Sequence, residues 1–154
     1  MNRAPIVVFA YNRPDHLQKT LEALSKNTLY QESDLFVFCD GVKQNSSAKN
    51  KELILKTREI ARNFSDNVYI SEQNQGLAKS IITGVTDIIN KYGRVIVLED
   101  DIVTGKYFLE YMNTALDKYE NTDGIWHITG WHEPIDIQNS TDSFFYPLMD
   151  CWSW

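Results

Sequence analysis

The stretch that decides the fold is VIVLEDDIV, residues 95–103, in which three consecutive acids follow one aliphatic run and precede another. The apolar, β-branched run is typical of a buried strand. Acids this close together repel and raise one another's pKa, so they cost stability unless a cation balances them. Mg²⁺ and Mn²⁺ prefer oxygen ligands and need only one or two carboxylates when substrate phosphates complete the shell. The stretch therefore indicates either a solvated turn or a metal site at a strand end.

The overall composition is that of one ordinary globular domain. The chain has 154 residues, of which 43% are hydrophobic and 23% charged, so it can bury a core. Its formal charge of -6 argues against a nucleic-acid-binding surface, which needs clustered Lys and Arg. The charge leaves open a small anionic ligand that is held together with a metal ion.

The sequence contains no segment typical of membrane insertion. No apolar run approaches the roughly 18 to 20 residues that a transmembrane helix needs. The first residues, MNRAPIVVFAYNRPDH, turn polar too early for a signal peptide. We therefore expect a cytoplasmic protein; peripheral contact with a membrane stays open, although no basic amphipathic helix supports it.

The cysteines and histidines do not form a recognisable metal or disulfide pattern. Cys39 and Cys151 are far apart and lie within apolar runs, which favours free buried thiols. His127 and His132, in HITGWH, lack the usual spacing of zinc ligands. We expect both histidines to have packing or hydrogen-bonding roles.

Short β-type runs alternate with longer helix-type runs along the chain. The first strand leads into a helix that has Pro14 in its first turn and Asp15 near its positive end. Strands that are apolar on both faces need helices on both faces, so the pattern predicts an α/β domain with a mostly parallel sheet. The predicted strands cover 5–11, 34–40, 67–71 and 94–100, and the predicted helices cover 13–27, the region around 53–61, 77–90 and 106–119.

Each of the first three predicted helices has an apolar face at helical spacing, which should pack on the sheet. Two further apolar runs, 124–131 and 144–148, follow the last helix. The faces consist of Leu17, Leu21 and Leu24 in the first helix, of Leu53, Ile54, Thr57, Ile60 and Ala61 in the second, and of Ile81, Ile82, Val85, Ile88 and Ile89 in the third.

Polar, charged and glycine residues follow each of the four predicted strands. The carboxyl ends of parallel strands meet at one edge of a sheet, where ligands of such proteins gather. We therefore expect one binding site at this edge. The residues concerned are Tyr11, Asn12 and Arg13, then Asp40 and Gly41, then Ser71, Glu72, Asn74, Gln75 and Gly76, and finally Glu99, Asp100 and Asp101.

Several of these residues have an ordinary interpretation beside the functional one. Arg13 is either an exposed residue at a helix start or a contact to an anionic group there. Asp40 is either half of a turn or an acceptor for the N–H of a base. Gly76 is either a flexible point before a helix or, with Lys79, a contact to a nucleotide phosphate or sugar.

Six motifs follow one another along the chain: PIVVFAYNRPDHLQKTLEAL, FVFCDG, NQGLAKSI, VIVLEDDIVTGKYFLEYM, ITGW and CWSW. Together they resemble the GT-A-fold nucleotide-sugar glycosyltransferases. The likeness is to the N-acetylglucosaminyltransferase I type, with the wider family-2-like inverting transferases behind it. It runs from Pro5 to Trp154 and implies a GT-A fold, with helices on both faces of a mostly parallel sheet.

The resemblance implies roles for the acidic triplet and for two residues near it. The EDD triplet stands where such enzymes carry their DXD-type signature, so Asp101 would coordinate Mn²⁺ or Mg²⁺ on the donor's diphosphate. Glu99 and Asp100 would face the donor sugar and the ribose hydroxyls. Arg13 would lie near the nucleotide, and Asp40 would read the edge of the uracil.

The resemblance also extends the donor site to residues outside the triplet. Tyr11 belongs to the same YNRP motif as Arg13, and Gly76 and Lys79 match the NQGLAKS segment more loosely. Trp131 matches the segment that lines the junction of donor and acceptor, together with His132 and Glu133. The partners implied are a nucleotide-sugar donor, with UDP as the nucleotide, and a glycan or glycoconjugate acceptor.

The catalytic base is not assigned to a residue of this sequence. An inverting transferase needs a base within hydrogen-bond reach of the attacking hydroxyl. In the family this residue lies beyond the segment that CWSW resembles, so we expect it beyond Trp154, with Glu133 and Asp150 as the candidates inside the chain. The apolar end FFYPLMDCWSW also leads us to expect that the 154 residues are the donor-binding part of a larger domain.

Two other functions stay open at this point. A sugar nucleotidyltransferase would share the sheet and the metal but should carry a glycine-rich basic loop after the first strand, which AYNRPDH lacks. A non-catalytic nucleotide-sugar or carbohydrate-binding module would need the donor site alone.

Overall fold

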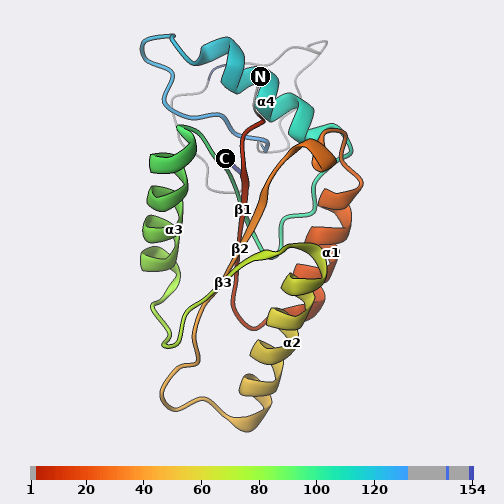
Figure 1. The fold of residues 1–154 in the computed structure, drawn as a ribbon, viewed down its shortest axis with the longest axis vertical. Coiled ribbons are helices and arrows are strands. Elements are labelled where there is room, and N and C mark those ends of the chain that lie inside the picture. Colours follow the sequence, from red (N-terminus) through yellow and green to blue (C-terminus); the bar gives the residue numbers. More distant parts are fainter. Residues whose placement is uncertain (1–2, 132–144, 146–152) are drawn as a thin grey trace.

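A computed structural model describes residues 3–131, 145 and 153–154 of the chain. Strands and helices alternate as the sequence predicts, and each lies within a few residues of its predicted range (Figure 1). The elements are β1 Ile6–Ala10, α1 Pro14–Ser25, a 3-10 helix Tyr30–Glu32, β2 Leu35–Cys39, α2 Ala48–Phe64, β3 Asn67–Ile70, α3 Leu77–Tyr92, β4 Ile96–Glu99 and α4 Phe108–Tyr119.

The four strands form one parallel sheet in the order β3-β2-β1-β4. The chain moves outward from β1 to β2 and β3 and then returns to place β4 on the other side of β1. The strand order therefore reverses between β1 and β4. In open parallel sheets this reversal leaves a crevice at the carboxyl ends of the strands, which is where ligands bind.

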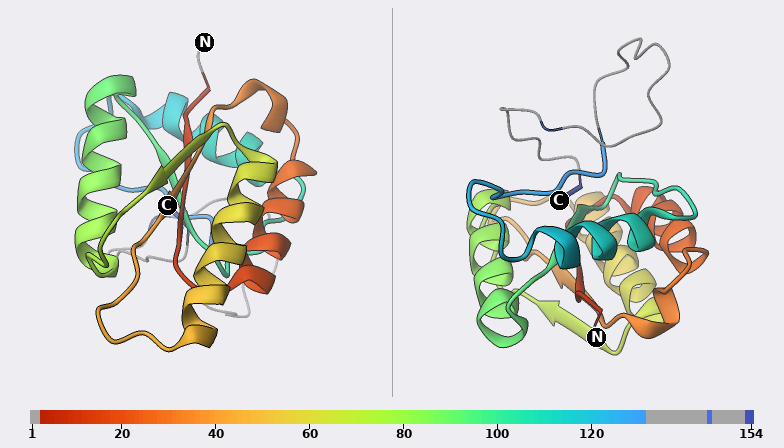
Figure 2. Two further views of the ribbon diagram at one scale, coloured as in Figure 1. Left: turned by 60° about the horizontal axis from the view of Figure 1, so that its bottom comes forward. Right: turned by 90° about the horizontal axis from the view of Figure 1, so that it is seen from above.

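The two faces of the sheet are covered by different helices, as predicted. α1 and α2 lie on one face and α3 lies on the other (Figures 1 and 2). Ile6, Val8 and Ala10 of β1 belong to the core cluster that includes the leucines of α1, and residues from α4 join it. Val7 and Phe9 alternate with them and belong to the cluster that includes residues of α3.

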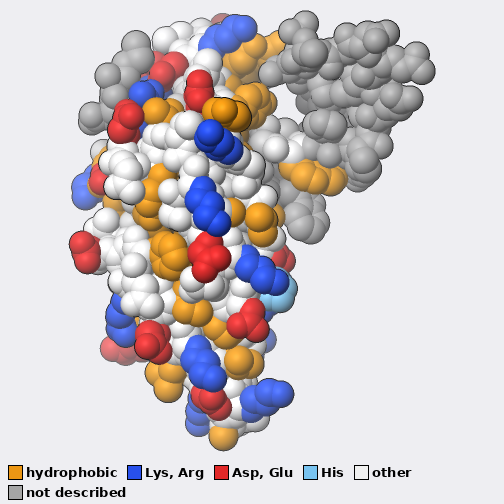
Figure 3. Space-filling model, turned by 90° about the vertical axis from the view of Figure 1, so that its right-hand side faces the viewer, with side chains coloured by type: hydrophobic (Ala, Val, Ile, Leu, Met, Phe, Trp, Pro, Cys, Tyr) orange, Lys and Arg blue, Asp and Glu red, His pale blue; other side chains and the backbone are white. Residues whose placement is uncertain are grey.

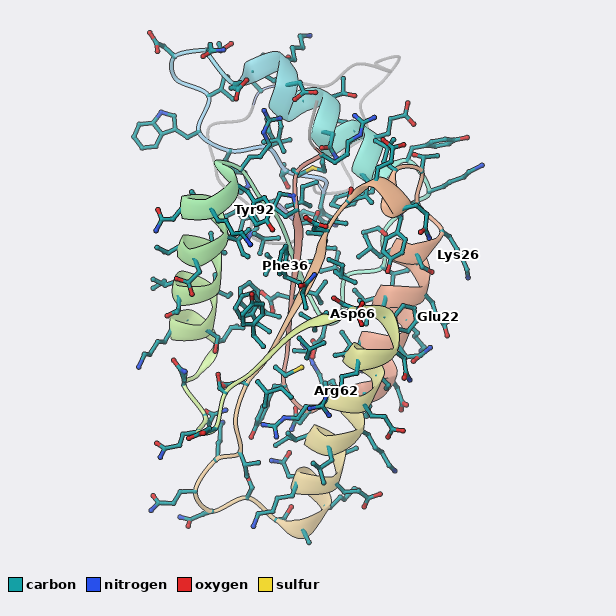
Figure 4. The ribbon with its side chains drawn as sticks, in the orientation of Figure 1. Glu22, Lys26, Phe36, Arg62, Asp66 and Tyr92 are labelled. Carbon is teal, nitrogen blue, oxygen red and sulfur yellow. The ribbon has the colours of Figure 1, made fainter. Side chains whose placement is uncertain are left out.

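The layer between the sheet and α3 is rich in aromatic rings. Figure 4 shows Phe36 of β2 and Tyr92 of α3 in this layer, and their ring centroids are 5.7 Å apart. Gly84 lets the helix approach closely, because a Cβ atom there would lie 2.9 Å from the ring of Phe9. The prediction that the apolar face of this helix packs on the sheet is therefore confirmed.

The predicted extent of that apolar side is wrong at two positions. Ile81, Val85 and Ile88 pack toward the sheet, whereas Ile82 is 68% exposed and Ile89 is 40% exposed. Ile82 follows Ile81 and Ile89 follows Ile88, so each points about 100° further around the helix axis than the residue before it. Both therefore point away from the cluster that Ile81 and Ile88 join.

The outer surface of α1 and α2 carries charges of both signs. Lys and Arg side chains are interspersed with Asp and Glu on the side of the molecule that bears these helices (Figure 3). One pair, Lys56 with Glu52, is an exposed salt bridge at helical spacing. A solvated surface of mixed charge is ordinary for exposed helices, so we look for the ligand-binding site at the strand ends.

Two side-chain predictions are confirmed as far as the structure describes them. Cys39 is a buried free thiol, and burial raises its pKa to about 11. The ring of His127 stacks on Trp154 with the centroids 5.7 Å apart, which is a packing role. Cys151 and His132 lie outside the described residues.

The run 124–131 does not form a strand. Gly130 N donates to Ser153 O at 3.0 Å, while Trp154 N donates to Val97 O at 3.1 Å and Val97 N donates back to Trp154 O. These bonds hold residues 153–154 against β4. Of the run 144–148, only Phe145 lies within the described residues. Within the part of the chain that the structure describes, no helix is long and apolar enough to span a membrane.

Candidate functional site

A cleft of about 290 Å³ opens at the carboxyl ends of β1, β2 and β4, where the strand order reverses. Apolar and polar residues both line it, which suits a ligand with an aromatic part and a charged part. The apolar residues are Phe9, Ala10, Phe38 and Leu77, and the others are Tyr11, Asn12, Arg13, Asp40, Lys43, Asn74, Gly76, Ser80, Glu99 and Asp100.

Six of the residues predicted to bind the donor line this cleft: Tyr11, Arg13, Asp40, Gly76, Glu99 and Asp100. The structure therefore brings together polar residues that follow β1, β2 and β4, as the strand-end rule predicts. Lys79 does not line it; it is an exposed residue in the first turn of α3.

A second hollow, of about 230 Å³, contains the other two predicted site residues. Asp101 and Trp131 line it together with Phe108 and the backbone between Ile102 and Gly105. Asp101 follows directly on Asp100, which lines the first cleft. Neighbouring residues of the acidic triplet thus line two different hollows. The proposed catalytic alternatives, Glu133 and Asp150, lie outside the described residues.

Arg13 is the cation that balances the acidic triplet. Its Nη1 donates to Asp101 Oδ2 at 2.8 Å, and its Nη2 donates to Asp100 Oδ1. Thr20 of α1 adds a hydrogen bond from its hydroxyl to the carbonyl oxygen of Asp100 at 2.9 Å. The start of α1 therefore supplies the positive charge that the neighbourhood of the triplet in the sequence lacks.

The acids of the triplet differ in their surroundings. Burial raises the pKa of Asp100, and Arg13 opposes this rise. Burial also raises the pKa of Glu99, with repulsion from Asp101 and Asp100 adding to it. Burial lowers the pKa of Arg13, but the bonds and charges of the two aspartates outweigh it and the net shift is upward. Burial therefore disfavours the charged forms of Glu99 and Asp100, and the charge of Arg13 offsets part of this effect.

The residues present fit a divalent cation only as partial ligands. The described residues contain no group of three or more His, Cys, Asp or Glu side chains that could enclose a metal. Asp101 is 31% exposed, and in the described structure only its Oδ2 is bonded to Arg13. One carboxylate of this kind suits Mg²⁺ or Mn²⁺ when the phosphates of a ligand provide further oxygens. The chemistry of Asp101 is thus compatible with Mn²⁺ or Mg²⁺, and this cofactor stays a prediction.

The carboxylate of Asp40 is held by hydrogen bonds from the chain itself. Oδ1 accepts from Gly41 N at 2.7 Å and from Gln75 N at 2.8 Å. Oδ2 accepts from the Asn74 side-chain amide at 2.8 Å and from Gly76 N at 3.0 Å. Asp40 therefore joins the end of β2 to the loop before α3, which neither sequence interpretation included.

The sequence interpretation did not assign Lys43, which lines the cleft, or Asn50, which bonds to two residues that line it. Asn50 of α2 donates to the Tyr11 hydroxyl at 3.2 Å and accepts from the Asn12 side chain at 2.6 Å. The ammonium group of Lys43 lies 5.8 Å from the centroid of the Tyr11 ring. Lys43 follows Asp40 closely enough that the strand-end rule could have included it. Asn50 lies on a helix beyond that loop, and no local signal marks it.

The parallel sheet, its cover of helices on both faces and the acidic cleft at the strand reversal define an α/β protein of the GT-A class. The model of the family described as "Glycosyltransferase like family 2" matches residues 3–144, and the chain belongs to this family. The wider family resemblance seen in the sequence is confirmed. The narrower likeness to the N-acetylglucosaminyltransferase I type stays a prediction.

Among solved structures, the chain is similar to S. aureus TarS and to S. aureus TarS 1-349 in complex with UDP. In both cases the sequence identity is 20%, the TM-score is 0.49 and 77% of this chain is covered. The chain spans 20% of the first of these proteins and 33% of the second. No match is found among curated proteins.

Proposed function

We propose that this chain forms the donor-binding part of a metal-dependent glycosyltransferase. The donor is a nucleotide-diphosphate sugar, with UDP as the nucleotide, and the acceptor is a hydroxyl group of a glycan or glycoconjugate. Family membership supports the class of reaction. The single observation that carries the proposal is the ion-pair cluster in which Arg13, which lines the cleft, bonds to Asp100 of the same cleft and to Asp101 of the second hollow.

The cleft is suited to a nucleotide diphosphate along its length. The rings of Phe9 and Phe38 provide an apolar wall for a base. α3 begins at this cleft with Gly76, which has no side chain that could cap the helix. The open amino end of a helix attracts phosphate oxygens, because its free N–H groups carry partial positive charge.

The chemistry of the acidic end follows from the charges there. Mn²⁺ or Mg²⁺, when bound with the donor at Asp101, stabilises the negative charge that develops on the leaving diphosphate. Arg13 places a second positive charge beside the same position. The acceptor enters from the second hollow, since Trp131 lines it and Asp101 lies at its edge. Within this chain, Glu133 and Asp150 stay the predicted candidates for the base that activates the acceptor hydroxyl.

Calorimetric titration of the chain with UDP, with and without Mn²⁺, tests the proposal. We expect Mn²⁺ to strengthen UDP binding, and the variant Asp101→Asn to weaken it by about tenfold or more, which corresponds to about 1.4 kcal/mol. Lys118→Ala is the matched control, because Lys118 is an exposed residue of the last turn of α4 that does not line the cleft, and it should leave the affinity within about twofold. Absence of UDP binding under both conditions would overturn the proposal, and binding that ignores both Mn²⁺ and Asp101→Asn would overturn its metal part.

An activity assay separates this function from the sugar nucleotidyltransferase. The connection between β1 and α1 consists of Tyr11, Asn12 and Arg13 and contains no glycine. We therefore expect no release of pyrophosphate when the chain is mixed with UTP, a sugar 1-phosphate and Mg²⁺. Steady release of pyrophosphate would contradict the transferase assignment.

A further inference from the structure

Ser80, near the start of α3, has a buried hydroxyl oxygen that bonds to no other group among the described residues. The residue lines the cleft together with the rings of Phe9 and Phe38. A buried hydroxyl without a partner is unfavourable, so its presence in the folded chain needs a physical explanation. A ligand in the cleft would supply the missing partner.

Thr57 of α2 shows the ordinary arrangement of a hydroxyl on a helix. Its Oγ1 donates to the carbonyl oxygen of Leu53, four residues earlier, at 2.9 Å. The equivalent acceptor for Ser80 is the carbonyl oxygen of Gly76, which accepts from the backbone N of Ser80 at 3.0 Å. The hydroxyl of Ser80 does not add a bond of this kind. The helix therefore leaves this hydroxyl available for another partner.

The position of Ser80 on α3 places its side chain at the aromatic end of the cleft. Residues four positions apart lie on the same face of a helix, so Gly76 and Gly84 lie about one turn before and after Ser80. Gly76 N donates to the carboxylate of Asp40 at 3.0 Å. A Cβ atom at Gly84 would lie 2.9 Å from the ring of Phe9. Ser80 therefore lies between the carboxylate and the rings, where we expect the base of a nucleotide.

We propose that the hydroxyl of Ser80 binds the pyrimidine base by donating to one of the two carbonyl oxygens that flank N3. In the predicted contact, Asp40 accepts from the N3–H of uracil, and O2 and O4 lie on either side of that position. Ser80 is partly exposed as a whole, so a rotation about χ1 turns its oxygen into the cleft. This inference rests on the proposed function, because it takes the ligand to be a uridine nucleotide.

Titration with UDP tests whether Ser80 contacts the ligand. We expect Ser80→Ala to weaken the binding of UDP about fivefold, as the loss of one hydrogen bond predicts. Ser25→Ala is the matched control, because it makes the same substitution at the end of α1 in a residue that does not line the cleft, and it should leave the affinity unchanged. Unchanged affinity in Ser80→Ala would overturn this inference and leave the proposed function in place. Absence of UDP binding by the wild-type chain would overturn both.

Two analogues of UDP test which group of the base is bound. In 2-thio-UDP and 4-thio-UDP one carbonyl oxygen is replaced by sulfur, which is a weaker acceptor. For at least one of them, the wild-type chain should lose about fivefold in affinity relative to UDP, and Ser80→Ala should show no such loss. If Ser80→Ala retains every loss that the wild-type chain shows, or the wild-type chain shows none, the proposal is overturned.

Urea unfolding of the ligand-free chain tests whether the hydroxyl has a partner inside the protein. Ser80→Ala removes an unbonded hydroxyl and introduces a better helix former, so the urea midpoint should stay the same or rise. Thr57→Val is the comparison, because it removes a buried hydroxyl that bonds to Leu53, and its midpoint should fall. A fall of the same size for Ser80→Ala would show an internal bond and would overturn the proposal.

Discussion

Asp40 and Asp100 are two buried acids at the ends of β2 and β4, and the fold stabilises them in different ways. Asp40 accepts four hydrogen bonds from uncharged groups, which come from Gly41 and the loop before α3. Asp100 pairs with the charged side chain of Arg13, which is 43% exposed. The first arrangement makes a wall of fixed geometry, and the second makes a charged end whose cation can also meet a ligand.

The physical reason lies in what each donor can do besides binding its acid. Backbone N–H groups cannot leave Asp40 without moving the chain, so this contact is part of the fold. Arg13 is a long side chain with five donors, and it can turn toward phosphate oxygens while it stays near the aspartates. A ligand that carries a diphosphate therefore meets a rigid side near β2 and an adjustable side near β4.

The largest expected effect comes from Gly41→Ala, which tests the rigid side. The new Cβ would lie 2.2 Å from the carbonyl carbon of Gln73, so the loop has to move away from β2. We expect the free energy of unfolding to fall by about 3 kcal/mol. Urea unfolding measures this change. Gly105→Ala is the matched control because nothing lies near its Cβ position, and equal midpoints for the two variants would contradict the rigid wall.

Arg13→Gln tests the adjustable side and should have a smaller effect. The pKa values of Glu99 and Asp100 are already raised, chiefly by burial, and loss of Arg13 raises them further. Because the pKa of each acid is higher in the folded chain than its ordinary value, 4.5 for Glu99 and 3.8 for Asp100, protonation favours the folded state. This contribution to stability is complete below the ordinary values and is lost as the pH rises through the raised ones. The variant should therefore lose about 1 kcal/mol at neutral pH, and less near pH 4.

Urea unfolding at both pH values measures the effect of Arg13→Gln. The control is Arg94→Gln, whose pairs with Asp117 and Glu120 lie away from the cleft. We expect the control to lose less stability and to show a weaker dependence on pH, because the side chains of Asp117 and Glu120 are 30% and 57% exposed whereas that of Asp100 is 3% exposed. A loss for Arg13→Gln that is larger at about pH 4 than at neutral pH would contradict the assignment of Arg13 as the balancing cation.

The smallest expected effect concerns Cys39, which lies next to Asp40. The reactivity of its thiol measures how far water reaches the end of β2. Burial raises the pKa of its thiol to about 11, above the ordinary value of 9.0. The thiolate is disfavoured in the folded chain, so stability is full below pH 9.0 and declines as the pH rises toward about 11. In a Cys151→Ala background, a thiol reagent at about pH 8 should react only after urea is added. Rapid reaction of the folded chain would show that the end of β2 is open to water.

The sequence predicts the secondary structure well because the signals are local. The leucines of α1 recur at helical spacing, and the strand runs are short and rich in β-branched and aromatic residues. The error at Ile82 and Ile89 has a different origin, because the burial of a helix face depends on what packs against it. That packing joins segments that are far apart in the sequence, so no single segment records it.

The position of the cleft also follows from the sequence. Parallel strands bring their carboxyl ends to one edge, so Tyr11, Asp40 and Glu99 had to lie near one another once the strands were recognised. The partner of each side chain does not follow in the same way. Arg13 and Asp101 are 88 positions apart, and Asn12 and Asn50 are 38 apart, so no local pattern connects them.

Sequence patterns alone were therefore enough for the parallel α/β architecture, the edge at which the cleft lies and the family. Only the tertiary structure showed that Arg13 balances the acidic triplet and that Asp40 accepts hydrogen bonds from the loop before α3. The physical reason is range. Periodicity acts between neighbours along the chain, whereas hydrogen bonds and ion pairs depend on separations of about 3 Å that packing of distant segments sets.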